Sequence, residues 1–251
     1  MNALFYKGFQ MFRKSRRKIC AIEALEVREL MSVQPVASLS ADGVLSISGS
    51  AGSDNIWVVS GSNGTTIVDV KGPPGRIGTF STNAIQSIRA NMGAGNDSLV
   101  VRSKFVDFKF IDVKMGTGVN ELVDVTVHRV NALSYDAKQS LNTKAYVINA
   151  TVGSLVADFG NDQDPGLDRL VLQSSAIDSV FANFGGGRDE FALKRSSIER
   201  GTVRMGSGDD SFGGNVGSSF RGDVFGGQGV DTFYGSGLQP RIRKEFEKFF
   251  I

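Results

Sequence analysis

The residues with the clearest chemical potential are three aspartates, Asp189, Asp210 and Asp231, spaced 21 residues apart along the chain. Each occupies the same place in a Gly-x-Gly-x-Asp-x-Phe segment, and the three segments are 185–191, 206–212 and 227–233. A constant period of this length is typical of repeat proteins, in which every repeat forms one coil stacked on the previous coil. We therefore expect the three carboxylates to form a single column along one edge of the molecule.

A column of like charges must be compensated. Stacked strands lie ~4.8 Å apart, and two carboxylates at that separation repel each other by about 0.9 kcal/mol in water. A bound cation, a basic neighbour such as Arg188 or simple solvation would each offset this cost. Calcium suits the site because it takes oxygen ligands from carboxylates and from the carbonyls of tight turns. The alternative is that each aspartate hydrogen-bonds its own turn as an Asx cap.

The last copy, Gly226-Gly-Gln-Gly-Val-Asp-Thr-Phe233, resembles the Gly-Gly-x-Gly-x-Asp-x-apolar frame of RTX (haemolysin-type) calcium-binding repeats. This resemblance implies a β-roll that holds calcium between successive coils. The chain departs from the RTX pattern because it has one glycine-rich turn in 21 residues, and because Phe184 and Met205 replace the first glycine. The metal-binding residues that the resemblance implies are Asp97, Gly187, Asp189, Gly208, Asp209, Asp210, Gly229 and Asp231.

Weaker copies of the same frame extend the repeat towards the amino terminus. Asp54 and Asp97 occupy the aspartate position in two of them, Asn120 replaces the aspartate in a third, and Asp168 belongs to a fourth. The step of 43 residues between Asp54 and Asp97, and that of 48 residues between Asn120 and Asp168, each predict two coils. The copy between Asp54 and Asp97 would then be eroded.

The segments between the turns alternate between apolar and other residues. Val180, Ala182 and Phe184 precede one turn at a common phase, and Phe191 and Leu193 follow it. Period-2 alternation predicts half-buried strands. With one glycine-rich turn per coil, the sequence predicts an all-β protein, a right-handed parallel β-helix or β-roll solenoid of about 21–24 residues per coil.

The chain divides into three predicted parts: a basic segment at 1–33, the solenoid at 34–238, and a tail at 239–251. In the tail, the apolar residues Ile242, Phe246, Phe249 and Phe250 follow helical spacing. They predict a short amphipathic helix that caps the last coil. A terminal secretion element or a membrane-surface element is the alternative for this tail.

The amino-terminal segment is predicted to contain an export signal. After the basic cluster at 13–18, Leu25-Glu-Val-Arg-Glu-Leu-Met-Ser32 resembles the Leu-Glu-x-Arg-x-Leu-Leu-Ser element of planctomycete extracellular proteins, with Met31 in place of the second leucine. The resemblance implies export to the cell surface or the medium. A standard signal peptide fits poorly because charged residues interrupt the apolar stretch, and a basic tail without an address is the alternative.

The charge distribution and composition indicate which classes of partner to expect. Basic residues gather at the two ends while residues 34–239 carry an acidic excess, so a nucleic-acid partner is not expected. No apolar run approaches the ~20 residues of a transmembrane helix, and the single cysteine, Cys20, allows no intramolecular disulfide. The expected partners are calcium and, at the cell surface, a glycan or other extracellular proteins.

These features together predict a secreted or cell-surface structural or adhesive solenoid with calcium-binding turns. A carbohydrate-active parallel β-helix enzyme, similar to a polysaccharide lyase, is the alternative function. Such an enzyme needs clustered carboxylates on one exposed face, and Asp107, Asp112 and Asp124 are the candidates. His128, the only histidine, is predicted to face outward from its strand. Trp57 is predicted to be a core or first-coil packing residue rather than a platform for sugar.

Overall fold

The computed structural model describes one folded unit and leaves the amino-terminal segment at 1–33, with its predicted export element, outside the described residues. Asn120 also lies outside them. Within the described part of the chain, no helix is long and apolar enough to cross a membrane. The residues described are 34–61, 63–71, 75–119, 123–140, 142–160, 166–235, 238, 241–244 and 246–250.

The described residues form twenty strands and a single 3-10 turn. The strands are β1 (Val36–Leu39), β2 (Val44–Ser48), β3 (Asn55–Ser60), β4 (Thr65–Val70), β5 (Arg76–Ser81), β6 (Ser87–Asn91), β7 (Ser98–Lys114), β8 (Val123–Asp136), β9 (Lys144–Ile148), β10 (Thr151–Asp158), β11 (Arg169–Gln173), β12 (Ala176–Asn183), β13 (Glu190–Lys194), β14 (Ser197–Ser207), β15 (Ser211–Gly214), β16 (Ser219–Phe220), β17 (Asp223–Gln228), β18 (Thr232–Tyr234), β19 (Arg241–Lys244) and β20 (Lys248–Phe250). The 3-10 turn is η1 (Thr82–Ala84).

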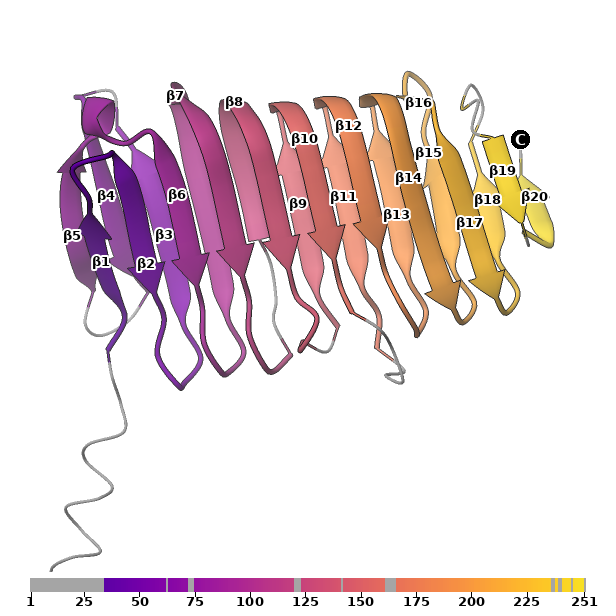
Figure 1. Cartoon of the computed structure of the whole chain (residues 1–251), viewed down its shortest axis with the longest axis horizontal. Coiled ribbons are helices and arrows are strands. Elements are labelled where there is room, and N and C mark those ends of the chain that lie inside the picture. Colours follow the sequence, from indigo (N-terminus) through magenta and orange to yellow (C-terminus); the bar gives the residue numbers. More distant parts are fainter. Residues whose placement is uncertain are drawn as a thin grey trace, which may run out of the picture. The chain divides into compact units, whose positions relative to one another are not determined.

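The strands stack into the two walls of a parallel solenoid. The front wall contains β2, β6, β10, β12, β14 and β17, and the rear wall contains β3, β9, β11, β13, β15 and β18. The long strands β7 and β8 bend and contribute to both walls. In Figure 1 the front strands run downward and the rear strands upward as the chain advances to the right, so the solenoid is right-handed. The predicted all-β parallel solenoid is confirmed.

The register explains the 21-residue period. Glu190 pairs with Ser211, and Ser211 with Thr232, so equivalent residues of successive coils lie directly above one another. Inward positions therefore stack like on like. Phe191 packs against Phe212 with ring centroids 5.2 Å apart, and Phe212 packs against Phe233 at 5.7 Å. Such stacked pairs add roughly 0.5–1.5 kcal/mol beyond the area they bury.

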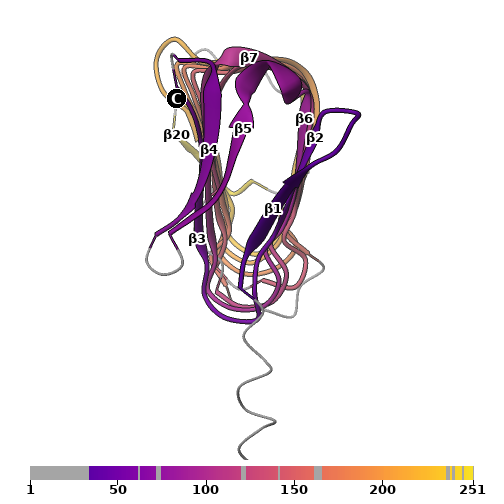
Figure 2. The ribbon, with the colours of Figure 1, turned by 90° about the vertical axis from the view of Figure 1, so that its left-hand side faces the viewer.

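The amino-terminal end corrects one prediction. Between Asp54 and Asp97 there is no eroded second coil, because β3 pairs directly with β7. The intervening residues leave the solenoid path as an antiparallel hairpin, in which β4 pairs with β3 and β5 pairs with β4. Figure 2 shows this hairpin, with β1, at the first coil. The alternation of β4 fits either a coil strand or a hairpin strand, so the pattern alone favoured the wrong one.

The tail corrects another prediction. The described residues at 241–250 form two strands, not a helix, and β19 and β20 pair in parallel with β17 and β18. A strand satisfies the open backbone edge of the last coil, which a helix would leave unpaired. Phe246 is buried and contacts Phe233 edge-on at 6.0 Å, so the tail still covers the last coil, whereas Phe250 is 62% exposed.

The glycine-rich turns stack so closely that a side chain has no room. Gly208 has φ of +133°, and a Cβ built on it would overlap the carbonyl oxygen of Gly187 in the preceding coil. Gly64 provides the contrast, because its φ of +76° is also positive but nothing lies within 4 Å of its Cβ position. The repeated glycines are therefore required by two causes, a positive φ and the stacking of coils.

These two causes can be separated by paired substitutions. We expect Gly64→Ala to lower the free energy of unfolding by about 1–2 kcal/mol, the cost of a positive φ. Gly208→Ala should lower it by about 2–5 kcal/mol, because steric overlap with Gly187 is added. Urea unfolding followed by circular dichroism measures both. Equal losses in the two variants would contradict the stacking argument.

Candidate functional site

The structure brings the predicted aspartates into one column. The aspartates lie at the bends between the walls, each directly before a strand of the rear wall or, for Asp97, before β7. Figure 1 shows these bends at the edge where the front strands end. The aspartates are almost completely buried, with no more than 5% of any of these residues exposed. The column contains Asp54, Asp97, Asp168, Asp189, Asp210 and Asp231. We call this set the aspartate ladder.

Beyond the first coil, the carboxylates of the ladder bind the preceding coil. The backbone N–H of Asp168 donates to Asp189 Oδ1 at 2.8 Å. The N–H of Asp189 donates to Asp210 Oδ1 at 2.8 Å, and that of Asp210 to Asp231 Oδ1 at 3.0 Å. The carboxylate of a later coil thus accepts a hydrogen bond from the equivalent residue of the coil before it. Hydrogen bonds to ionised groups are shorter and stronger than neutral ones.

The ladder extends beyond the copies that the sequence displays most clearly. At one end, the N–H of Asp54 donates to Asp97 Oδ1 at 2.9 Å, across 43 residues. In the middle, Thr143 takes the aspartate position and its N–H donates to Asp168 Oδ1 at 2.6 Å. At the other end, the N–H of Asp231 donates to Glu247 Oε2 at 2.7 Å. The step of 48 residues between Asn120 and Asp168 predicted an additional coil, and Thr143 lies in it. The role of Glu247 in the ladder was not predicted, because the tail was interpreted as a helix.

The Asx-cap alternative describes Asp54. Asp54 Oδ2 accepts from the backbone N–H of Ser50 at 2.6 Å and from its hydroxyl at 3.0 Å, all within one turn. The carboxylates of Asp189, Asp210 and Asp231 instead reach the preceding coil. The difference has a simple cause, since Asp54 belongs to the first coil and has no earlier coil to bind.

The predicted glycines and Asp209 form the outer part of the turns. The N–H of Gly187 donates to Ser207 O at 2.8 Å, and the N–H of Gly208 to Gln228 O at 2.6 Å. Gly229 continues the same stack at positive φ. Asp209 is exposed, and its Oδ1 accepts from the N–H of Val230 at 2.9 Å. The turn backbones are therefore joined along the solenoid axis, and Asp209 adds an outer rung beside the ladder.

Burial raises the pKa of two ladder residues, Asp97 and Asp210. It raises the pKa of Asp210 to about 7, the charges of Asp231 and Asp209 add to the rise, and the hydrogen bond to the Asp189 backbone opposes it. Burial likewise raises the pKa of Asp97 to about 7, opposed by its hydrogen bond to the Asp54 backbone and increased by the Asp54 charge. The desolvation of the charged form outweighs the favourable hydrogen bond at both residues.

The donor set near Asp210 suits a hard cation. Asp210 Oδ2 is buried without a hydrogen-bond partner, and the exposed carboxylate of Asp209 adjoins it in the chain. Carboxylate oxygens with turn carbonyls are the ligands that calcium prefers. Within the ranges that the structure describes, no three or more His, Cys, Asp or Glu side chains converge as a metal-binding group.

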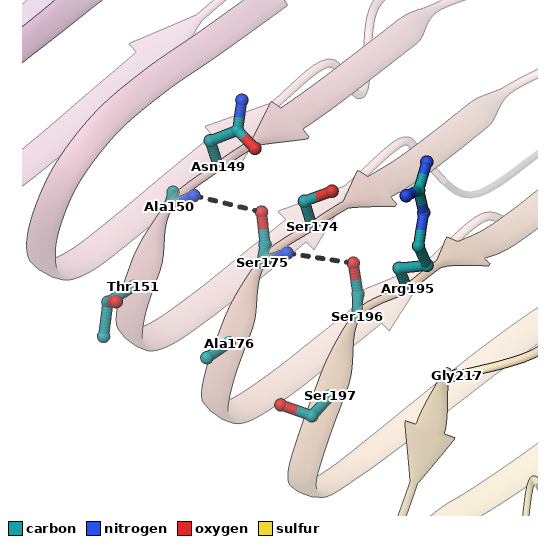
Figure 3. Close-up of a pocket in the computed structure, with 10 residues that line it drawn as sticks. All are labelled: Asn149, Ala150, Thr151, Ser174, Ser175, Ala176, Arg195, Ser196, Ser197 and Gly217. Carbon is teal, nitrogen blue, oxygen red and sulfur yellow. Dashed lines mark hydrogen bonds between the residues drawn. The ribbon is translucent and has the colours of Figure 1, made fainter.

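A second ladder, which the sequence analysis missed, lines the opposite corner of the coil. The N–H of Ala150 donates to Ser175 Oγ at 3.2 Å, and the N–H of Ser175 to Ser196 Oγ at 3.1 Å (Figure 3). The residues that turn the chain there, Ser174 and Arg195, both have φ of 50°. This corner forms a shallow polar groove of about 410 Å³. Serine at the 21-residue period was the available signal.

The enzyme candidates are not brought together. Asp112 lies in the front wall, where it contacts Arg89 at 3.5 Å. Asp124 lies in the rear wall and pairs with Arg102 at 3.0 Å. Asp107 lies near the bend of β7 and contacts His128 Nδ1 at 2.8 Å. His128 faces outward as predicted, but the three carboxylates occupy different sides of the coil.

Trp57 corrects one half of its prediction, because it is a residue of the first coil but does not lie in the core. It alternates along β3 with the buried Ile56 and Val58, which places its indole on the outer surface rather than in the core. The guanidinium of Arg102 lies 5.3 Å from the ring centroid. Its position on the outer surface makes Trp57 accessible to a ligand.

Comparisons of the chain with protein-family models, with curated proteins and with solved structures give no match. The functional interpretation therefore depends on the geometry of the ladder and its turns. The raised pKa of Asp210 gives that geometry a measurable consequence, because a carboxyl group that holds its proton more tightly when folded stabilises the fold below its unfolded pKa of 3.8. That stability is lost as the pH rises through about 7.

We therefore expect Asp210→Asn to flatten the dependence of stability on pH between about 4 and 7. The amide oxygen of asparagine can still accept from the Asp189 N–H, but the side chain no longer ionises. In a chelator at pH 8, the variant should be more stable than the wild type by about 1–3 kcal/mol. Urea unfolding at a series of pH values measures this.

Asp178→Asn provides the matched control, because Asp178 is exposed on the outer face of β12. This variant should retain the pH profile of the wild type. Superimposable profiles for the wild type and Asp210→Asn would show that the ladder does not hold its protons as described.

Proposed function

We propose that the protein is an exported structural or adhesive β-solenoid whose Gly-x-Gly-x-Asp turns bind calcium. The observation that carries the proposal is the aspartate ladder, which buries carboxylates in successive coils. A fold that only needed to close its turns could use neutral asparagine, since the hydrogen bond requires no charge. The repeated copies instead carry aspartate at 189, 210 and 231, which supports a role for the negative charge in binding a cation.

The electrostatic argument for a cation concerns neutral and higher pH. Asp210 then loses its proton, and its buried charge is repelled by Asp209 and Asp231. A divalent cation near Asp209 and Asp210 would offset that repulsion and provide a partner for Asp210 Oδ2. Donors that are all oxygen favour calcium or magnesium over softer metals. Irregular oxygen ligands at a turn favour calcium, because magnesium demands octahedral geometry.

Export is the second part of the proposal. It is supported by the resemblance of Leu25-Glu-Val-Arg-Glu-Leu-Met-Ser32 to an element of extracellular proteins. Extracellular calcium modules work at dissociation constants of about 10⁻⁴–10⁻³ M, which suits a site with few charged ligands. A solenoid also presents long regular outer faces, and these would meet a cell-surface glycan or another extracellular protein.

The calcium proposal predicts a thermal shift. At pH 7.5, about 5 mM calcium should raise the melting temperature of the full chain by roughly 2–9 °C relative to a chelator. The same concentration of magnesium should have a smaller effect. The double variant Asp209→Asn/Asp210→Asn should lose the shift, whereas Asp178→Asn should keep it. A wild-type melting temperature that does not respond to calcium would remove this part of the proposal.

The export proposal predicts the fate of a reporter. Residues 1–33 fused before a reporter enzyme and expressed in a planctomycete host should direct it out of the cytoplasm. A matched fusion with residues 25–32 in scrambled order should remain inside, because order and spacing carry the resemblance. Cell fractionation measures both. Retention of the native fusion in the cytoplasm would exclude an export function for this segment.

A further inference from the structure

A groove of about 730 Å³ lies on the outer surface at the amino-terminal end of the solenoid, between β3, β4 and β5. This volume is in the range of small-molecule sites. At the groove, the pairing of β4 with β5 shifts register between Val68 and Asp69. Such an irregularity bends a strand pair, while β4 remains paired with β3 as far as Val70, opposite Ile56. Figure 2 shows β3, β4 and β5 side by side at the first coil. The lining includes Trp57, Val59, Asp69, Val70, Lys71 and Arg76.

The indole of Trp57 forms a rigid wall of this groove. Its Nε1–H donates to Asn55 Oδ1 at 2.6 Å, which fixes the orientation of the ring. The guanidinium of Arg102, on β7, lies 5.3 Å from the ring centroid. Because β7 and β4 flank β3 on opposite sides, the ring stands between Arg102 and the groove. Val59, 37% exposed, extends the apolar surface. A rigid aromatic wall costs little entropy when a ligand binds.

The charged residues of the groove give it an excess of positive charge. Asp69 is held by Arg76 at 3.3 Å, and both remain partly exposed. Lys71 is exposed and makes no ion pair with the described residues. One carboxylate and two cations therefore line the groove. The cations suit an anionic group, and Asp69 can accept a hydrogen bond from a hydroxyl.

We propose that this groove binds an acidic saccharide, such as an oligosaccharide that contains uronic acid. The apolar C–H face of a pyranose ring would stack on the indole of Trp57. Lys71 and Arg76 would bind the sugar carboxylate, and Asp69 would accept from a ring hydroxyl. This inference rests on the proposed adhesive function and deepens it, because it names the class of ligand that the exported protein would hold.

The same kind of cation–aromatic pair occurs on the front wall, away from this groove. Phe181 on β12 is 38% exposed, and the guanidinium of Arg204 lies 5.9 Å from its ring centroid. Neither residue lines the groove. This pair therefore supplies a matched control for the effect of an exposed aromatic ring beside arginine.

Trp57 is the only tryptophan in the chain, so tryptophan fluorescence, excited at a wavelength that tyrosine does not absorb, reports on this groove. Titration of the full chain with oligogalacturonate of three to six residues (about 1–2 nm long) should change the emission in a saturable way. Neutral cello-oligosaccharides of the same length should bind at least about tenfold more weakly. Lys71→Gln should weaken the acidic ligand about three- to tenfold, and Phe181→Ala should leave it unchanged.

Calorimetry on Trp57→Ala completes the test, with an expected loss of at least about tenfold in affinity. Lys71 is exposed, so Lys71→Gln remains informative if Trp57→Ala does not fold. No response of the folded wild type to oligogalacturonate, or equal affinities for the wild type and Lys71→Gln, would overturn the proposal.

The calcium and saccharide proposals fail separately. None of the groove residues belongs to the aspartate ladder, so the titration is run both in a chelator and in calcium. Saccharide binding in a chelator without a calcium-dependent melting shift would support the groove and reject the metal. A calcium-dependent shift without saccharide binding would reject the groove alone.

Discussion

The hydrogen bond from the N–H of one ladder aspartate to the carboxylate of the next is the interaction on which the solenoid edge depends. The stacked glycines of these turns have no side chains to pack against each other, because the coils approach too closely at those positions. The carboxylates take over that role and join equivalent residues such as Asp189 and Asp210. A buried N–H without a partner costs about 1–3 kcal/mol, so each rung also removes a penalty. The glycines and the aspartates therefore act together, because the glycines let the coils approach and the aspartates hydrogen-bond one coil to the next.

The same arrangement buries carboxylate groups, and burial disfavours their charged form. Each rung gains a short hydrogen bond and pays for the desolvation of a carboxylate, and at Asp97 and Asp210 the desolvation prevails. Asp97 and Asp210 must then take up protons, or in our proposal calcium must bind, for the fold to reach full stability at neutral pH. The fold is in this way coupled to the composition of its surroundings. In our proposal, the exported protein would meet calcium at the concentrations that extracellular calcium modules bind.

The sequence was a good guide wherever residues stack in register. Phe191 and Phe212 recur at the period of the coil because like side chains must lie above each other, and the solenoid followed from that period. The sequence was a poor guide where the stack ends. The alternation of β4 could not distinguish a coil from a hairpin, and the spacing of the tail mimicked a helix. The outward position of Trp57 depended on the phase of β3, and the direction of the carboxylate bonds depended on coordinates.

Amide hydrogen exchange at Asp189 tests the central claim most directly. Its N–H donates to Asp210 Oδ1 at 2.8 Å, so Asp210→Ala should accelerate exchange of that amide by about 10–100-fold under conditions of local opening. Asp210→Asn should leave it protected, and the amide of Asp168, which donates to Asp189 Oδ1, should stay protected in both variants. Equal protection of the Asp189 amide in the wild type, Asp210→Asn and Asp210→Ala would contradict the ladder as the link between coils.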